Sequence, residues 1–245
     1  MKPFQNTKLP QNRKTIGYGQ AGIGKSTWAS KAPKPIFIPT EDGVSSLQVD
    51  QFPLCKTLSD VKKCIDWLGK EQHEYKTVVL DSADWLESLI CADVCAKAGC
   101  KVIGDFEWGK GYQRASHGML MVLDALDALR IDKSMHVIVL AHSKTERHED
   151  PEHPAFDRYT LKLHKTAASL LVEWADEVFF MRLKARTSTT QDGPKTVTKA
   201  KPDGRSMVAN GRPACIAKNR LGMPDEIPMT WDAYAGYFTQ EGGKK

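Results

Sequence analysis

The chain has 245 residues, of which 41% are hydrophobic and 27% charged, and its 35 basic and 30 acidic side chains leave a formal net charge of +5. This length suits one large domain or two small ones, and the mildly basic balance permits a nucleic-acid partner without requiring one. No apolar run approaches the roughly 18 residues of a membrane span, and residues 1–14 lack the apolar core of a secretory signal. The six scattered cysteines are too few for a disulfide scaffold. We therefore expect a cytoplasmic protein with reduced thiols and no membrane partner.

Apolar runs and helical periodicities alternate along the chain up to about residue 180. Compact apolar runs predict buried strands at 15–18, 36–38, 77–80, 136–141 and 177–183. Helical spacing predicts helices at 27–31, 58–70, 83–98, 116–130 and 167–175. The strands are apolar throughout rather than alternating, which is typical of a parallel sheet with helices on both faces. The predicted fold class is therefore α/β.

The two ends of the chain differ in character from this alternating part. Residues 1–14 lack periodicity, and we expect them to form a flexible N-terminal arm. We expect residues 15–235 to form a single domain and residues 236–245 to form a tail.

The character of the sequence changes after residue 183. Residues 187–211 are rich in Thr, Lys, Gly and Asp and carry several turn signals, so they predict β-hairpins that flank the apolar segment 214–217. From Arg182 to Arg220 there are ten basic residues and two acidic ones, a balance of +8. Such concentrated positive charge in this basic β-hairpin region (about 183–220) is expected of a polyanion-binding surface, with a merely solvated hairpin as the alternative.

A glycine-rich segment follows the first expected strand and precedes the first expected helix. Residues 19–26 read GQAGIGKS and match the phosphate-binding pattern G-x-x-x-x-G-K-[ST] in full. Glycines let successive backbone N–H groups turn toward one anion, Lys25 reaches the β- and γ-phosphates, and the Ser26 hydroxyl ligates Mg²⁺. The residues expected to bind ATP are Gly19, Gln20, Ala21, Gly22, Ile23, Gly24, Lys25, Ser26 and Thr27.

A second element must help to hold the metal ion. The apolar run 77–80 ends in Asp81, which places a carboxylate at the tip of a buried strand. We expect Asp81 to bind Mg²⁺ directly or through water. The alternative is that Asp81 or Ser82 caps the helix that starts near Ala83, and both roles are compatible.

An acidic residue follows the strand 36–38. If that strand lies beside the strand of the phosphate loop, Glu41 sits at the carboxyl edge of the sheet and faces the γ-phosphate. A carboxylate in that place can orient and polarise an attacking water molecule. The alternative is an ordinary acidic turn.

Taken with the phosphate loop and Asp81, this pattern resembles the RecA-type ATPases. In that family a glutamate just after the strand that follows the phosphate-loop helix is the catalytic base, and Glu41 occupies that place. A later strand of the family ends in a polar residue that senses the γ-phosphate, and here the strand 136–141 is followed by His142 where RecA itself has glutamine. The alternative for His142 is a strand-end histidine bonded to a backbone carbonyl.

A basic pair near the end of the chain is the fourth point of resemblance. RecA-type recombinases carry two cations spaced by one residue that reach across the subunit interface to the neighbour's ATP, and Lys218 and Arg220 are similar to that pair. Two such residues on a strand point to the same face and could both meet transition-state charge. The resemblance thus implies a homo-oligomer, either a filament or a ring; an exposed basic strand end is the alternative.

DNA-contacting loops are expected at the end of the sheet by the same resemblance. Residues 101–116 interleave aromatic and basic side chains, which suits stacking on bases together with phosphate contact. The candidate DNA-binding residues are Trp108, Lys110, Tyr112 and Arg114. A packed loop anchored by its aromatic residues is the alternative. Residues 143–165 form a second candidate, long and polar but nearly balanced in charge.

The layout as a whole looks closest to the short phage-encoded RecA-like ATPases of the single-strand annealing or recombination type, over roughly residues 14–230. The resemblance implies an ATPase that uses Mg²⁺ and acts on single-stranded DNA, with a single-strand DNA-binding protein as a further candidate partner. One alternative is a helicase loader or other replication accessory protein that uses ATP as a switch. The other is a P-loop kinase, in which Glu41 and the late basic pair have no clear task.

Overall fold

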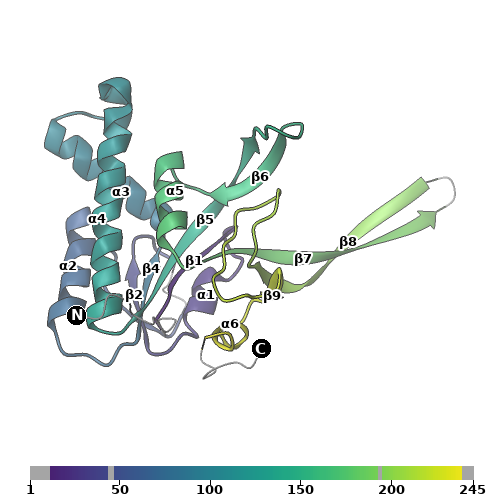
Figure 1. The fold of residues 1–245 in the computed structure, drawn as a ribbon, viewed down its shortest axis with the longest axis horizontal. Coiled ribbons are helices and arrows are strands. Elements are labelled where there is room, and N and C mark those ends of the chain that lie inside the picture. Colours follow the sequence, from purple (N-terminus) through teal and green to yellow (C-terminus); the bar gives the residue numbers. More distant parts are fainter. Residues whose placement is uncertain (1–11, 44–46, 193–194, 239–245) are drawn as a thin grey trace, which may run out of the picture.

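In the computed structural model the described residues are 12–43, 47–192 and 195–238, and nine strands among them form one sheet (Figure 1). The strands are β1 (Lys14–Gly19), β2 (Pro35–Pro39), β3 (Asp50–Gln51), β4 (Thr77–Asp81), β5 (His136–His148), β6 (Phe156–Leu161), β7 (Glu177–Asp192), β8 (Lys195–Val208) and β9 (Glu226–Pro228). Their order across the sheet is β3-β2-β4-β5-β1-β7-β8-β9, and β6 pairs with β5.

The first six strands of that order are parallel to one another, whereas β8, β9 and β6 are antiparallel to their partners. The helices are α1 (Lys25–Ala29), α2 (Leu58–Lys70), α3 (Ala83–Ala98), α4 (Lys110–Asp132), α5 (Lys165–Trp174) and α6 (Trp231–Ala235), with two short 3₁₀ helices, η1 (Ile103–Asp105) and η2 (Glu107–Gly109). No helix in the described ranges is long and apolar enough to cross a membrane.

Alternate residues of the central strands pack into two separate cores. In β5, Val137 and Val139 contact the core formed with α2, α3, α4 and α5, while Ile138 and Leu140 face the core formed with α1 and α6. Because successive side chains of a strand point to opposite faces, a strand buried on both sides must be apolar throughout. The predicted α/β class, with a mostly parallel sheet and helices on both faces, is confirmed.

Local signals set the ends of the helices that the sequence predicts best. Thr57 begins α2 with a capping box: its hydroxyl accepts from the Asp60 amide, and the Asp60 carboxylate accepts from the Thr57 amide at 3.0 Å. Gly99 ends α3 in the left-handed conformation with φ 69°, which glycine adopts without a steric penalty. Both helices therefore have the predicted bounds.

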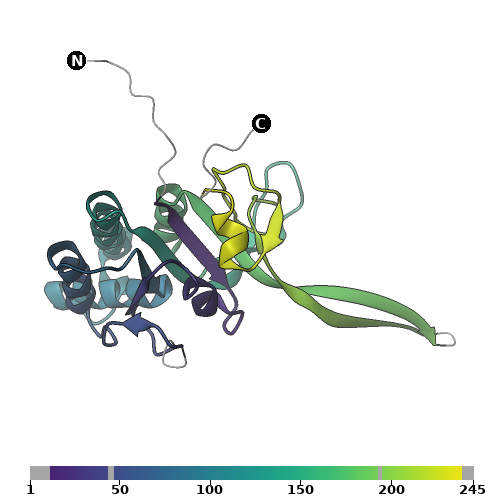
Figure 2. The same cartoon turned by 90° about the horizontal axis from the view of Figure 1, so that it is seen from below.

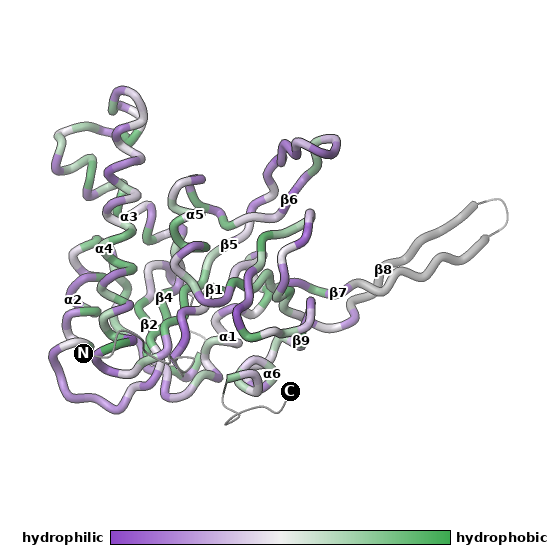
Figure 3. The backbone as a smooth tube through the Cα atoms, in the orientation of Figure 1, coloured by the Kyte–Doolittle hydropathy of each residue, from purple (hydrophilic) through white to green (hydrophobic). Residues whose placement is uncertain are grey.

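Two polar segments have more regular secondary structure than the sequence predicts. Residues 143–161 are not a loop, because β5 continues past the apolar run to His148 and returns as β6, and Figure 3 shows the outer end of this hairpin to be hydrophilic. Helix α4 begins at Lys110 rather than near residue 116. Ladder hydrogen bonds and helical turns at exposed positions need no apolar side chains, so apolar periodicity does not reveal them.

The predicted C-terminal hairpins are mainly one long antiparallel ribbon. Strands β7 and β8 pair from Phe180–Val208 out to Asp192–Lys195, with a bulge near Leu183, and Figure 2 shows this β7–β8 ribbon reaching far from the rest of the protein. Residues 214–217 form no strand; Cys215 makes isolated bridges to its neighbours instead.

A buried polar network ties the start of the domain to its end. Arg13 is 2% exposed and donates to the Glu177 carboxylate, which also accepts from the Tyr234 hydroxyl at 2.9 Å. The Tyr234 hydroxyl in turn lies 2.7 Å from the Thr15 hydroxyl. Arg13 and Lys14 thus belong to the domain, not to the predicted flexible arm, because a guanidinium that neutralises a buried carboxylate must be held in place.

The remainder of the predicted arm, residues 1–11, and most of the predicted tail, residues 239–245, lie outside the described residues. Phe238, inside the predicted tail, packs edge-on against Tyr234 with ring centroids 4.8 Å apart.

Replacing Arg13 tests this network. Arg13→Met leaves the Glu177 carboxylate buried without its cation, so the free energy of unfolding should fall by about 3–5 kcal/mol in a urea titration. Lys97→Ala, which removes the exposed pair with Asp93 on α3, is the matched control and should cost at most about 1 kcal/mol. Equal losses in the two variants would contradict a structural role for the buried pair.

Candidate active site

The phosphate loop joins β1 to α1 at the carboxyl edge of the sheet. Gly24 has φ 99°, a conformation that side-chain-bearing residues rarely adopt. At Gly19 a Cβ atom would lie 2.4 Å from the carbonyl oxygen of Met181 on the neighbouring strand. The two glycines therefore meet separate needs: Gly24 supplies the turn, and Gly19 allows the close approach of β7.

Lys25 is folded back onto the loop that it serves. Its side chain is 5% exposed, and Nζ donates to the carbonyl oxygens of Gly19 at 3.4 Å and Gln20 at 3.2 Å. Burial lowers the pKa of Lys25, and the nearby Asp81 and Glu41 carboxylates oppose that shift. Two neutral carbonyls are weak partners for an ammonium group, so a phosphate oxygen would compete well for it.

Ser26 and Asp81 meet as the sequence predicts. The Ser26 hydroxyl donates to Asp81 Oδ2 at 2.5 Å, which brings the start of α1 to the end of β4. Asp81 is 1% exposed, and its other oxygen, Oδ1, is buried with no hydrogen-bond partner among the described residues. Burial raises the pKa of Asp81, against the pull of the Ser26 hydroxyl and the Lys25 ammonium.

These two side chains fit Mg²⁺. An orphaned carboxylate oxygen beside a hydroxyl is a hard-oxygen donor set, and a bound cation would offset the cost of burying the Asp81 charge. The described residues contain no group of three or more His, Cys, Asp or Glu side chains arranged to hold a metal ion. Mg²⁺ usually keeps several waters and the phosphates of its nucleotide, so the two oxygen ligands from Ser26 and Asp81 fit its needs.

Glu41 lies at the site, but its strand is not beside the strand of the phosphate loop as the prediction assumed. Strand β2 is not next to β1, because β4 and β5 lie between them. Thr40 extends the pairing of β2 with β4: its amide donates to the Asp81 carbonyl at 2.7 Å, its hydroxyl donates to the Ser82 carbonyl at 2.7 Å, and that hydroxyl accepts from the Ser82 amide at 2.8 Å. These bonds hold the loop that carries Glu41 against the end of β4.

The Glu41 carboxyl faces the sensor candidate. Its Oε1 lies 3.9 Å from Nε2 of His142, the residue that follows the apolar run of β5. Burial raises the pKa of Glu41, and the His142 ring opposes the shift. A raised pKa makes a carboxylate a stronger base, which suits a residue that must accept a proton from water.

Asp84 is a site residue that the sequence interpretation missed. Its Oδ1 accepts from the His142 amide at 3.0 Å, and its Oδ2 lies 3.0 Å from His142 Nδ1. Burial opposes ionisation, but the contacts with the ring and amide of His142 hold the pKa of Asp84 below its usual value. The only available signal was an acidic residue in the first turn after Asp81, which also describes an ordinary helix start.

The predicted basic pair is not near the phosphate loop of its own chain. Lys218 pairs with Val178 near the start of β7, and its Nζ donates to the carbonyls of Val172, Glu173 and Ala175 at 2.7–3.0 Å. Arg220 forms an ion pair with Asp176 at 3.2 Å and keeps 56% of its side chain exposed. Lys218 therefore has all three donors engaged at the end of α5, whereas Arg220 remains accessible.

The four predicted DNA-binding residues do not form one loop platform. Trp108 is 89% exposed with a positive φ of 56°, but Lys110, Tyr112 and Arg114 lie on α4. The Tyr112 ring stacks on His164 at 4.1 Å and 10°, which covers one face of the ring. Arg114 lies over the Phe106 ring at 5.0 Å. Of these four residues, Trp108 alone has the open ring faces that base stacking requires.

A cavity of about 460 Å³ adjoins the phosphate loop on the side of α1. Gly24 and Thr27 line one wall, and Arg205, Met229 and Asp232 line the other. Arg205 lies so close to the loop that its Nη1 would be 2.9 Å from a Cβ atom at Gly24. Sequence reasoning found no residue for the nucleoside, because this wall comes from β8, Met229 and α6, far away in the chain.

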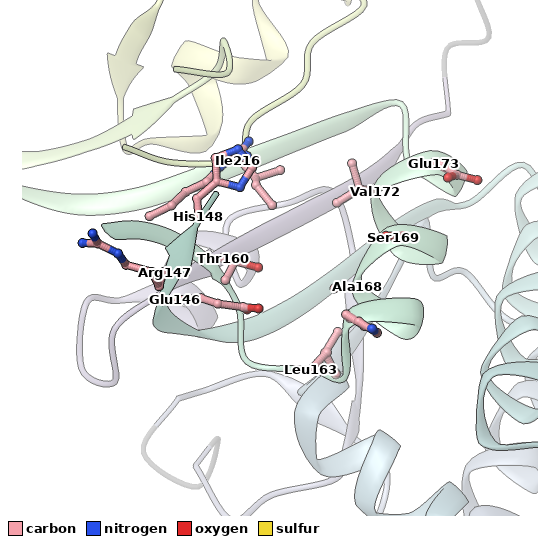
Figure 4. Close-up of a pocket in the computed structure, with 12 residues that line it drawn as sticks. Glu146, Arg147, His148, Thr160, Leu163, Ala168, Ser169, Val172, Glu173 and Ile216 are labelled. Atoms are coloured by element: carbon pink, nitrogen blue, oxygen red, sulfur yellow. The ribbon is translucent and has the colours of Figure 1, made fainter. Parts of the chain in front are cut away.

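Another cavity has a volume of about 300 Å³. Figure 4 shows its lining side chains, which come from the β5–β6 hairpin, the turn at Leu163, α5 and Ile216. Leu163, Val172 and Ile216 give it an apolar lining. None of the predicted nucleotide-binding residues lines it. The candidate active site is therefore at the phosphate loop and not in this cavity.

Comparisons with known proteins agree with this site. A family model described as an AAA domain matches residues 11–221. The chain is also similar to an SPbeta prophage-derived uncharacterized protein, YorG, of Bacillus subtilis (strain 168), with 26% identity over 98 residues. That alignment covers 38% of this chain and 30% of the relative.

Removing the Ser26 hydroxyl tests the metal assignment. Ser26→Ala should weaken ATP binding about tenfold or more when Mg²⁺ is present, equivalent to about 1.4 kcal/mol, and leave Mg²⁺-free binding unchanged in nucleotide titrations. Ser30→Ala, just beyond the same helix, is the control, because Ser30 does not line the cavity beside α1 and its exposed hydroxyl contacts only the Thr27 carbonyl among the described residues. A loss that does not depend on Mg²⁺ would argue against Ser26 as a ligand.

The two late basic residues should separate in a stability measurement. Lys218→Ala strips three carbonyls at the end of α5 of a charged donor and should lower the free energy of unfolding by about 2 kcal/mol. Arg220→Ala removes one exposed ion pair and should cost less than about 1 kcal/mol. Abolished ATPase activity in a fully stable Lys218→Ala protein would instead favour the trans-acting role.

Proposed function

The chain belongs to the AAA-domain family of P-loop ATPases, and from that premise we propose that it hydrolyses ATP while acting on single-stranded DNA in phage recombination or strand annealing. The observation that carries the ATPase part is the meeting of Lys25, Ser26, Asp81 and Glu41 at one edge of the sheet. These groups come from the loops and ends of three strands, and each has a chemistry that phosphoryl transfer requires.

The proposed reaction assigns a task to each of these groups. The loop amides and Lys25 hold the phosphates, and Ser26 and Asp81 hold Mg²⁺, which neutralises charge on the phosphates when it is bound. Glu41 accepts a proton from a water molecule and so directs it at the γ-phosphate. His142, whose Nε2 lies 3.9 Å from Glu41 Oε1, is the proposed sensor of the γ-phosphate.

The cavity beside α1 is the proposed place of the nucleoside. It is lined by Gly24 and Thr27, so we propose that a nucleotide whose phosphates occupy the loop extends into it. Asp232 offers acceptors for ribose hydroxyls, Met229 an apolar contact for the base, and Arg205 a cation for the phosphates.

Single-stranded DNA is proposed as the polyanion because basic residues concentrate in one region of the sequence. The segment from Arg182 to Arg220 has ten basic and two acidic residues. It contains both strands of the β7–β8 ribbon beyond the base of the ribbon. Trp108 lies in η2, between α3 and α4. Figure 1 shows the ribbon and the helices α3 and α4 on opposite sides of the protein, so one chain does not offer them as one continuous surface.

We propose a homo-oligomer, either a filament or a ring, because two sets of residues are too far apart within one chain. The ribbon is distant from the helices α3 and α4, and the basic pair is distant from the phosphate loop. An oligomer would set the ribbon of one copy near α3 and α4 of another, and it would let Arg220 reach a neighbour's ATP. The prophage-derived relative supports a phage setting, with action in the cytoplasm of a bacterial host and a single-strand DNA-binding protein as a candidate partner.

Glu41→Gln tests the catalytic base. The amide cannot take a proton, so steady-state ATP hydrolysis should fall by about 10²- to 10⁴-fold while ATP binding stays within a factor of two or so of the parent. Asp42→Asn changes the adjacent exposed carboxylate and should leave turnover unchanged. Unchanged turnover in Glu41→Gln would remove Glu41 from the reaction.

Charge reversal on the ribbon tests the DNA assignment. Arg186, Lys199 and Lys201 changed to Glu should weaken single-stranded DNA binding, and the slope of log affinity against log salt should fall by about 0.7 for each phosphate that the variant no longer neutralises. The same charge change at Lys56, Lys63 and Lys70, outside the ribbon, is the control. Equal weakening in the two variants would argue against the ribbon as the DNA-binding surface.

ATP hydrolysis measured with and without single-stranded DNA separates the proposed function from the main alternative. Salt-sensitive stimulation that is absent from the ribbon variant and present in the control would support a DNA-dependent ATPase. ATP binding with no response to DNA would favour a protein that uses ATP as a switch, such as a helicase loader.

A further inference from the structure

The Asp84 carboxylate contacts His142 at two points. One carboxylate oxygen accepts from the backbone amide of His142 at 3.0 Å, and the other lies 3.0 Å from ring Nδ1. The Asp84 side chain is 8% exposed and the His142 side chain 20%. Asp84 lies in the first turn of α3, and its carboxylate is turned toward His142 on β5. The contact therefore joins α3 to the strand that carries the sensor candidate.

This contact decides which ring nitrogen bears the proton. An ionised carboxylate has acceptors and no donor, so a hydrogen bond to Nδ1 requires the proton to be on Nδ1. In a neutral imidazole the proton is then absent from Nε2, which is left as an acceptor. Nε2 is the atom that faces Glu41, 3.9 Å from Oε1. That separation is too long for a direct hydrogen bond, so the two groups are free to contact a shared water molecule or a phosphate oxygen.

We propose that Asp84 is a positioning residue for ATP hydrolysis, which holds the His142 ring with Nδ1–H toward itself and Nε2 toward Glu41. The inference rests on the proposed ATPase reaction, because its value lies in aiming Nε2 at the reacting groups. Without Asp84 the ring can rotate about its side-chain bonds and exchange the proton between its nitrogens. For histidines that ligate a metal, loss of an orienting carboxylate commonly costs about 10- to 100-fold in activity, and we expect an effect of similar size for His142.

A purely structural tie between α3 and β5 makes a different prediction. The backbone amide of His142 needs only an acceptor, and the asparagine of an Asp84→Asn variant still provides one. The ring contact is different, because the side-chain amide of that asparagine can donate to Nδ1 and would then favour the proton on Nε2. Asp84→Asn therefore keeps the tie between the two elements while reversing the preference of the ring.

The primary experiment is nitrogen NMR of the full chain with labelled histidine, at an alkaline pH where a free imidazole is neutral. His142, assigned by the absence of its signals in His142→Gln, should show Nδ1 protonated in the parent protein. In Asp84→Asn the proton should move to Nε2. A parent spectrum with Nε2 protonated overturns the proposal without any need for the variant to fold.

The second experiment is a double-mutant cycle on steady-state ATP hydrolysis with Asp84→Asn, His142→Gln and the double variant. Asp84→Asn should lower kcat about tenfold or more with the KM for ATP little changed, and it should add nothing in the His142→Gln background because glutamine has no tautomer to set. An equal loss in both backgrounds overturns the inference. Failure of the proposed reaction would show separately, as hydrolysis that survives Glu41→Gln while the NMR result stands.

Discussion

Three hydrogen bonds made by Thr40 hold the candidate active site together. They join the loop after β2 to the Asp81–Ser82 peptide at the end of β4, although neither segment is adjacent to the phosphate loop in the sheet. Glu41 follows Thr40 directly, and Asp81 contacts Ser26, so one short bridge relates the candidate base to the candidate metal ligand. Parallel strands make this possible because their carboxyl ends all reach the same edge.

The site contains charged side chains that are buried at the edge of an otherwise apolar sheet. Lys25, Asp81 and Asp84 are all buried or nearly so, and each is costly to ionise away from water. Their partners offset that cost: Asp81 lies near the Lys25 ammonium and accepts from Ser26, and Asp84 is held by His142. The Asp81 oxygen left without a partner among the described residues, Oδ1, is the atom that Mg²⁺ would satisfy.

The base of the β7–β8 ribbon is continuous with the nucleotide site. Arg205 on β8 lies against Gly24 of the phosphate loop, and Glu226 on β9 accepts from Arg182 on β7 at 3.1 Å and from the Ser206 hydroxyl. These contacts lock three strands beside the loop at the point where the ribbon leaves the sheet. Because the base of the ribbon contacts the phosphate loop, a polyanion bound to the ribbon could shift the loop through Arg205. This contact offers a physical explanation for the proposed dependence of ATP hydrolysis on DNA.

The sequence by itself determined the phosphate loop, the apolar strands, the bounds of α2 and α3, and the types of residue at the site. These features are local: glycine conformations, capping residues and apolar runs act within a few positions of the chain. Tertiary structure alone decided the strand order that separates β2 from β1, the bridge by Thr40, and the contact between Asp84 and His142. It also decided that Lys218 caps α5 and that Arg205 and Asp232 form a cavity beside Gly24. Each of these depends on residues dozens of positions apart, which sequence patterns do not relate, because only the folded sheet brings them to one edge.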